Sequence, residues 1–282
     1  MSLESTSAQE FLERFESPPS TSESTDALNN ELLVLRDSEL GPRLDRAMRE
    51  GEDIRYLYQA MQDAVWMKRE TLVKELLRCK MPISSTYVQT AAEAKAKNIL
   101  TIFFDNGWDI NTPLDELTPP VLASALEDRE MTEWLLDRGA DPNMRCELDY
   151  TPLTHAVQMF DVPTVDHLLD RGGDVNKGEL VYWAIGRYRE ENLEMVKFLI
   201  DRGAPFNALL HENHEHSRRL FPHYTRTPLH LAVSSKKHNV IRYLIQKGAS
   251  VDIKDYKDKT AVECADEDTR KIIMAEIQKR SQ

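Results

Sequence analysis

The chain has few cysteines and no long apolar run, and its positive charges are outnumbered. Cys79, Cys146 and Cys264 form neither a CxxC motif nor a close pair. An odd, scattered set of thiols is typical of a reducing compartment rather than of a disulfide-bonded secreted domain. No stretch of about 18 apolar residues occurs, and the first residues lack a secretion signal. We therefore expect a soluble protein of the cytoplasm, the nucleus or both.

The charge balance excludes some partners. The chain has 36 Lys and Arg against 48 Asp and Glu, a net charge of −12. Phosphate backbones and anionic membranes are bound by clustered Lys and Arg, so we expect neither nucleic acid nor membrane as a partner. A protein partner with basic regions is compatible with this field. The sequence also lacks a glycine-rich phosphate loop and a GxSxG elbow, so we predict no enzyme, cofactor or metal.

Although glycine is scarce, five of the 10 glycines recur at a near-constant spacing. Intervals of 32, 33 and 31 residues separate Gly107, Gly139, Gly172 and Gly203, and Gly248 follows. Each comes shortly after a bulky apolar pair, where a glycine can end a helix in the left-handed conformation. Such a period indicates one supersecondary unit repeated along an axis. Repeats of this kind favour an extended binding surface over a single catalytic pocket.

The starts of the repeats are also alike. Thr118, Thr151 and Thr227 each precede a proline. Threonine can cap a helix N-terminus, and proline suits the first helical position because its missing N–H has no partner there. A small residue then stands 16 residues before the closing glycine, namely Ala123, Ala156 and Ala232.

These motifs together resemble the ankyrin repeat over roughly residues 86–265. The matching features are Thr-Pro-Leu-His at 227–230, the small residue, the Leu-Leu-x-x-Gly ending and Gly-Ala-Asp-Pro-Asn at 139–143. The resemblance implies an all-α ankyrin-repeat solenoid of stacked helix–turn–helix units with β-hairpin or loop fingers. It also implies that a protein partner docks on the concave face made of finger tips and first helices.

We divide the chain into four parts on this basis. Residues 1–25 are rich in Ser, Thr, Glu and Pro and are predicted to be a disordered tail. Residues 26–85 hold N-terminal helices and a degenerate capping repeat, and residues 86–259 hold five ankyrin repeats. Residues 260–282 form a C-terminal capping repeat, which departs from the pattern because one side of it faces water.

Two repeats break the pattern. The fourth begins with Glu179 and Leu180 in place of Thr-Pro and carries a short insertion at 187–191. The next finger, about 206–226, is longer, with 24 residues from Gly203 to Thr227 against 12 from Gly139 to Thr151. It contains His211, His214, His216, Arg218, Arg219, Phe221, His223, Tyr224 and Arg226. It is either a tolerated insertion, since longer loops cost little, or a partner-binding element, since Phe, Tyr and Arg are common interface anchors.

The predicted partner-binding residues are Leu117, Leu148, Tyr150, Met159, Arg187, Tyr188, Arg218, Arg219, Phe221, Tyr224, Arg226 and Tyr256. For Leu117, Leu148 and Tyr150 the alternative is that they pack finger against finger. We expect a non-enzymatic adaptor, chaperone or inhibitor that is monomeric on its own. A transcriptional or signalling co-regulator stays open, as does a small-molecule enzyme using the His-rich loop. The His-x-x-His-x-His spacing in that loop is not the helical HExxH zinc motif.

Overall fold

The computed structural model describes residues 23–187, 192–212 and 214–280, apart from the side chains of Glu23, Ser24 and His223. Most of the predicted tail therefore lies outside the described residues, as does Tyr188. The chain forms two compact units, Met1–Gly107 and Trp108–Gln282. The boundary follows the first of the five recurring glycines. None of the described helices is long and apolar enough to cross a membrane.

The first unit is built from paired helices. They are α2 (Glu23–Val34), α3 (Asp37–Arg49), η1 (Ile54–Tyr56), α4 (Tyr58–Trp66), α5 (Glu70–Arg78), α6 (Ser85–Glu93) and α7 (Lys97–Asp105). Helix α4 packs against α2, α5 and α6, while α5 packs against α3 and α7. Leu32, Leu72 and Phe103 are fully buried in the core of this unit.

The second unit is also built from helix pairs, and its residue range includes all the predicted site residues. Its elements are η2 (Val121–Ala125), α8 (Arg129–Leu136), α9 (Pro152–Met159), α10 (Val162–Asp170), α11 (Leu180–Gly186), α12 (Asn192–Asp201), α13 (Glu215–Leu220), η3 (Pro222–Tyr224), α14 (Pro228–Ser234), α15 (His238–Gln246), α16 (Ala261–Cys264) and α17 (Glu267–Arg280).

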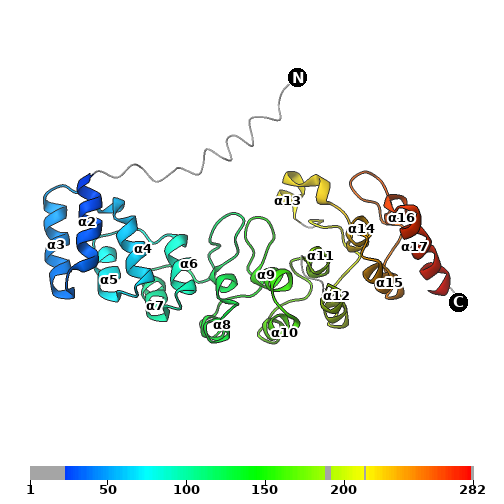
Figure 1. Cartoon of the computed structure of the whole chain (residues 1–282), viewed down its shortest axis with the longest axis horizontal. Helices are drawn as coiled ribbons and strands as arrows, with labels where there is room; N and C mark the ends of the chain where they lie inside the picture. The colour runs from blue at the N-terminus through cyan, green and yellow to red at the C-terminus, as the bar shows by residue number, and fades with distance from the viewer. Residues whose placement is uncertain (1–22, 188–191, 213, 281–282) are drawn as a thin grey trace, which may run out of the picture. The chain divides into compact units, whose positions relative to one another are not determined.

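The helices of the second unit stack in two layers. The first elements of the repeats, η2, α9, α11, α14 and α16, pack one against the next, and α10, α12, α15 and α17 do the same behind them. In Figure 1 the fingers of this unit project on one side, and α8, α10, α12 and α15 lie on the opposite side. The predicted all-α solenoid is confirmed. Among the described residues, β-structure is limited to two isolated antiparallel bridges in the fingers, Pro113–Pro120 and Lys254–Thr260.

The predicted helix ends are confirmed. The five recurring glycines have φ angles of +97°, +89°, +102°, +91° and +99°. After the turn at Gly139, the Ala140 N–H donates to the Leu135 carbonyl at 3.1 Å. The same bond recurs from Ala204 to Leu199 at 2.9 Å. These bonds satisfy the last helical carbonyls and set the direction in which each finger leaves.

Two of the three Thr-Pro starts behave as predicted. Thr151 Oγ1 accepts the Thr154 N–H at 2.9 Å and caps α9, and Thr227 caps α14 in the same way. Thr118 does not cap a helix: its hydroxyl donates to Asp115 at 2.8 Å, and the next helical element, η2, begins only after Pro120. A second proline, Pro120, disfavours the helical conformation for Pro119, and Pro120 itself has a ψ of 163°, so the helix cannot start at Pro119 and the short 3₁₀ helix η2 follows.

An asparagine ladder joins successive fingers. Asn143 donates from Nδ2 to the Gly172 carbonyl at 2.8 Å and accepts the Asp174 N–H at 2.7 Å. Asn111 makes the equivalent pair of bonds one repeat earlier. Each asparagine thus satisfies two backbone groups of the next repeat and fixes the distance between neighbouring fingers.

The ladder is interrupted before the long finger. The next residue in the series, Asn176, donates from Nδ2 to Asp174 of its own finger. Its expected partner two residues after Gly203 is Pro205, which has no N–H to donate. The ladder therefore lacks its step into the long finger, and it resumes on the other side, where Asn207 of the long finger accepts the Ser250 N–H at 2.9 Å.

Candidate functional site

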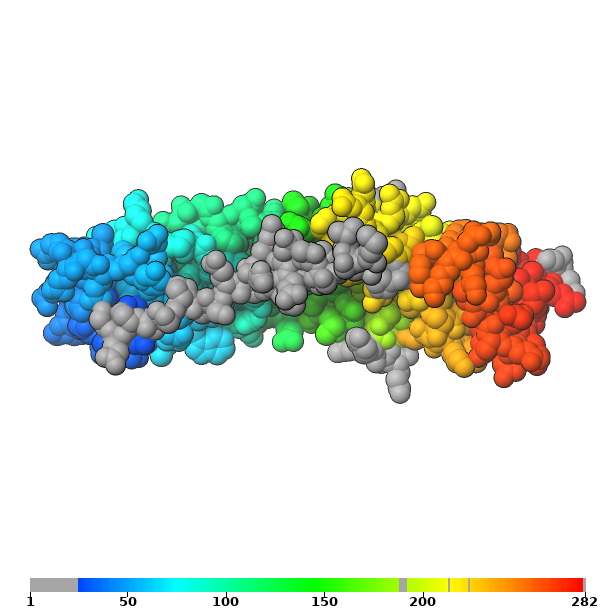
Figure 2. Space-filling view, turned by 90° about the horizontal axis from the view of Figure 1, so that it is seen from above, coloured from blue at the N-terminus to red at the C-terminus, as the bar shows by residue number. Residues whose placement is uncertain are grey.

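The long finger is a folded element with three anchors. Its base is closed by the Leu210 N–H, which donates to the Arg226 carbonyl at 3.1 Å. Arg226 Nε donates to the Tyr182 hydroxyl at 3.2 Å, and the His211 N–H donates to Glu179 Oε1 at 2.7 Å. Between these anchors lie α13 and η3, which the sequence did not predict. In Figure 2 the finger, coloured yellow, stands out from the surface of the second unit.

An apolar cavity of about 310 Å³ lies between this finger and its neighbours. Its lining residues come from three fingers and from α9 and α11. They are Leu117, Leu148, Tyr150, Gln158, Tyr182, Trp183, Leu210, His211, Phe221 and Tyr224. Five of them, Leu117, Leu148, Tyr150, Phe221 and Tyr224, belong to the set predicted from the sequence.

Aromatic rings in edge-to-face contact form the walls of the cavity. The ring centroids of Tyr150 and Trp183 are 5.4 Å apart, and those of Phe221 and Tyr224 are 6.1 Å apart. The Tyr150 hydroxyl donates to Gln158 Oε1 at 2.5 Å, so its polar end is satisfied inside the wall. Burial raises the pKa of Tyr150, which keeps the hydroxyl neutral. Leu117 and Tyr224 are 47% and 43% exposed.

Other predicted residues lie outside this cavity. Met159, at the end of α9, is 47% exposed, and Arg218 and Arg219 are exposed on α13. Tyr256 belongs to the following finger and is 44% exposed. Its N–H donates to the Thr225 carbonyl at 3.0 Å, which joins that finger to the long one.

One predicted surface residue is corrected by the structure. Arg187 is only 4% exposed, and its Nη2 donates to the Phe160 carbonyl at 2.7 Å. Phe160 directly follows α9, so this guanidinium holds the third and fourth repeats together. Arg187 is not part of an open binding surface, because burial commits its charge to a backbone carbonyl.

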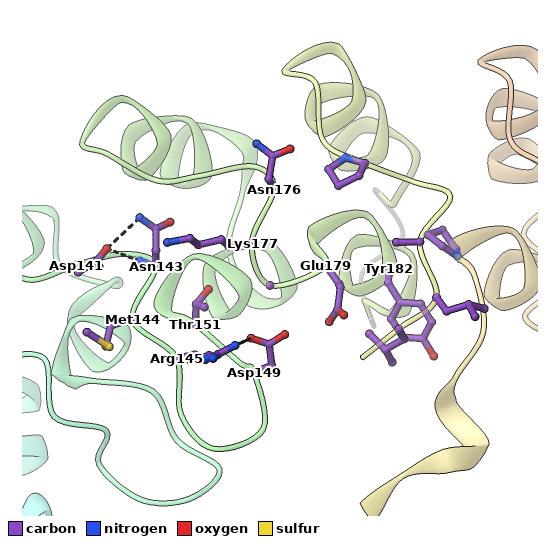
Figure 3. A pocket seen from close by; sticks show the side chains of 16 residues that line it. Asp141, Asn143, Met144, Arg145, Asp149, Thr151, Asn176, Lys177, Glu179 and Tyr182 are labelled. Atoms are coloured by element: carbon purple, nitrogen blue, oxygen red, sulfur yellow. Dashed lines mark hydrogen bonds and ion pairs between the residues drawn. The ribbon is translucent and has the colours of Figure 1, made fainter. Parts of the chain in front are cut away.

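A second cavity, of about 630 Å³, opens at the interruption of the asparagine ladder. Asn143, Asn176 and Pro205 are among the residues that line it. In Figure 3 the carboxylates of Asp149 and Glu179 point toward each other across this cavity. Arg145 Nη1 lies 3.2 Å from Asp149 Oδ1.

Asp149, Glu179 and His211 form a compact cluster. Potential metal-ligand atoms of the three residues all lie within 4.8 Å of one another. Their side chains are 17%, 21% and 7% exposed. Burial, reinforced by the Asp149 charge, raises the pKa of Glu179 to about 7. Burial also lowers the pKa of His211, which favours a neutral imidazole.

The backbone of the cluster is unusual as well. Asp149, Glu179 and His211 have φ angles of +59°, +49° and +61°, a region that costs a residue with a side chain about 1–2 kcal/mol. The sequence prediction singled out His211 but missed Asp149 and Glu179. Their spacing could have revealed them, because 30 residues separate Asp149 from Glu179 and 32 separate Glu179 from His211. Intervals close to the repeat period bring such residues side by side.

Comparisons with known proteins agree with this architecture. The family model for ankyrin repeats (3 copies) matches residues 61–179, 121–209 and 178–255. Alpha-latrocrustotoxin-Lt1a of Latrodectus tredecimguttatus is 29% identical over 151 residues, which are 51% of this chain and 10% of the toxin. A putative ankyrin repeat protein of fowlpox virus is 25% identical over 176 residues, which are 61% of this chain and 38% of the viral protein. The chain therefore matches well under half of the length of either relative.

A solved structure has the same fold. The ankyrin repeat domain of Bcl-3, a member of the IkappaB protein family, superposes with a TM-score of 0.52 at 19% identity, covering 76% of this chain and 97% of that domain. The family model spans residues 61–255, well over half of the chain, and the helix pairs, left-handed glycines and fingers follow the same repeat. The chain belongs to the ankyrin-repeat family and has the fold of a protein–protein interaction module.

Proposed function

We propose that this chain is a non-enzymatic adaptor, chaperone or inhibitor that holds a protein partner on the face made of its fingers and first helices. The observation that carries the proposal is the apolar cavity beside the long finger. It gathers aromatic and aliphatic side chains from three fingers and from α9 and α11. Cavities of this kind accept the buried anchor side chains that dominate interface energies.

The cavity favours a particular kind of partner segment. A volume of about 310 Å³ lies at the lower end for ligand pockets and suits one or two apolar side chains. Arg218 and Arg219 are exposed on α13, close in sequence to Phe221 of the cavity wall. We therefore propose an aromatic or aliphatic anchor flanked by acidic residues. Basic regions elsewhere in the partner would suit the net charge of −12.

Other parts of the prediction stay proposals. They are the four-part division of the chain, a monomeric free state and a cytoplasmic or nuclear location. A role as transcriptional or signalling co-regulator would use the same surface and differ only in the partner. Catalysis on a small molecule has less support, because no nucleophile–base pair stands out among the described residues.

The test is affinity capture of partners by the tagged full-length chain. The decisive variant carries Phe221→Ala and Tyr224→Ala together, because both rings line the cavity and Tyr224 is exposed. Loss of an anchor contact of at least about 2 kcal/mol would weaken binding at least about 30-fold. Partners identified by mass spectrometry are then titrated against the purified chain by calorimetry.

The matched control is Met274→Ala. Met274 is 54% exposed on α17, within the same unit but outside the cavity lining. The proposal expects this variant to bind like the wild type. If the double variant retains full affinity for every captured partner, the cavity is not the binding site.

A further inference from the structure

Three side chains with atoms that can bind a metal ion lie close together, and they come from three successive fingers, the last of which is the long finger. Glu179 Oε2 and His211 Nδ1 are 3.7 Å apart, and Asp149 contributes a carboxylate oxygen within the same 4.8 Å cluster. In a tetrahedral zinc site with bonds of about 2.0–2.1 Å, ligand atoms lie about 3.3 Å from each other. The Glu179–His211 distance exceeds this value by about 0.4 Å, and the distances to the Asp149 oxygen are at most 4.8 Å, so rotation of the side chains has to bring the three donors closer around an ion.

Two of the donor atoms are buried without a hydrogen bond. The His211 side chain is 7% exposed, hence more than nine-tenths buried, and its Nδ1 has no hydrogen-bond partner in the part of the chain that the structure describes. Glu179 Oε2 is likewise a buried atom with no hydrogen-bond partner among the described residues. At 3.7 Å the two atoms are too far apart to bond to each other. Buried polar atoms are nearly always satisfied, so this pair calls for a third group between them.

The donor set indicates the kind of group. An imidazole nitrogen with two carboxylates suits zinc and similar first-row metals, whereas magnesium and calcium prefer oxygen ligands in larger number. Two carboxylates balance the charge of one divalent ion. The wider cavity, lined by Asp149 and Glu179, leaves room for water as a fourth ligand. Arg145, 3.2 Å from Asp149, would orient that carboxylate from outside.

From this geometry we infer that Asp149, Glu179 and His211 bind one divalent first-row metal ion, zinc above all, and that the ion fastens the long finger to the third and fourth repeats. The role is structural. His211 also lines the apolar cavity, so the ion would hold one of its walls in place. The inference stands on the cluster alone and does not depend on the proposed partner.

The experiment titrates zinc chloride into the chelator-treated full-length chain by calorimetry. The wild type should bind one zinc ion. Glu179→Gln and His211→Asn should each weaken that site at least about tenfold, since even outer-shell changes cost 10–100-fold. Both variants preserve local structure, because glutamine keeps the acceptor for the His211 N–H and asparagine tolerates the left-handed backbone.

Two controls separate this site from surface binding. His216 is an exposed histidine of the same finger and Cys264 is an exposed thiol, and neither belongs to the cluster. His216→Asn and Cys264→Ser should therefore leave zinc affinity unchanged. Melting curves without metal confirm that every variant folds, and added zinc should raise the melting temperature of the wild type but not of Glu179→Gln. Absence of zinc binding by the wild type, or equal affinity in the wild type and the two ligand variants, overturns the inference.

Discussion

Glu179 should make the stability of the protein fall as the pH rises. Its pKa in the folded chain is raised to about 7, first by burial and then by the charge of Asp149, whereas an exposed glutamate titrates near 4.5. Between these two values the folded chain binds a proton that the unfolded chain releases. The stabilisation is therefore present below pH 4.5 and is lost as the pH rises through 7. At about 1.4 kcal/mol per pH unit, the loss amounts to at most about 3.5 kcal/mol.

Glu179→Gln isolates this contribution. The variant keeps the acceptor for the His211 N–H at 2.7 Å but removes the buried charge. In chelator-treated buffer it should be more stable than the wild type at pH 8 by up to about 3.5 kcal/mol, and the difference should vanish near pH 4.5. Urea unfolding followed by circular dichroism at several pH values measures it, and Glu147→Gln, at an exposed carboxylate, is the control. A difference that does not change with pH would refute the reasoning.

Three further predictions test the stacking of the repeats. Asn143→Ala removes two ladder bonds and should cost about 2 kcal/mol of unfolding free energy in urea, whereas Asn176→Ala should cost under about 1 kcal/mol; equal losses would contradict the ladder. Arg187→Ala should destabilise the chain by about 2 kcal/mol in thermal melting, because it removes a buried charged donor, and unchanged stability would contradict its role. In the native chain Cys264 alone should react rapidly with a thiol reagent, and rapid reaction of the two buried cysteines would show that the units open.

The repeat could be predicted from the sequence, but the arrangement of side chains at the candidate site could not. Helix ends at Gly139 and caps at Thr151 depend on a few neighbouring residues, so their local pattern predicts them. The prediction that a helix starts at Thr118 was wrong, because Pro120 disfavours the helical conformation at Pro119 and η2 begins only after it. The cavity and the cluster depend on which side chains three fingers bring together, and the long finger follows a path set by its anchors at Tyr182 and Glu179. No local pattern encodes those distances.

The most direct test of the account is amide hydrogen exchange of the full-length chain with and without a captured partner. If the partner docks at the apolar cavity, protection should appear in the fingers at 146–150 and 208–226. Helices α10, α12 and α15, on the opposite side of the second unit in Figure 1, should exchange as before. Protection confined to those three helices, with the fingers unchanged, would contradict the proposed binding face.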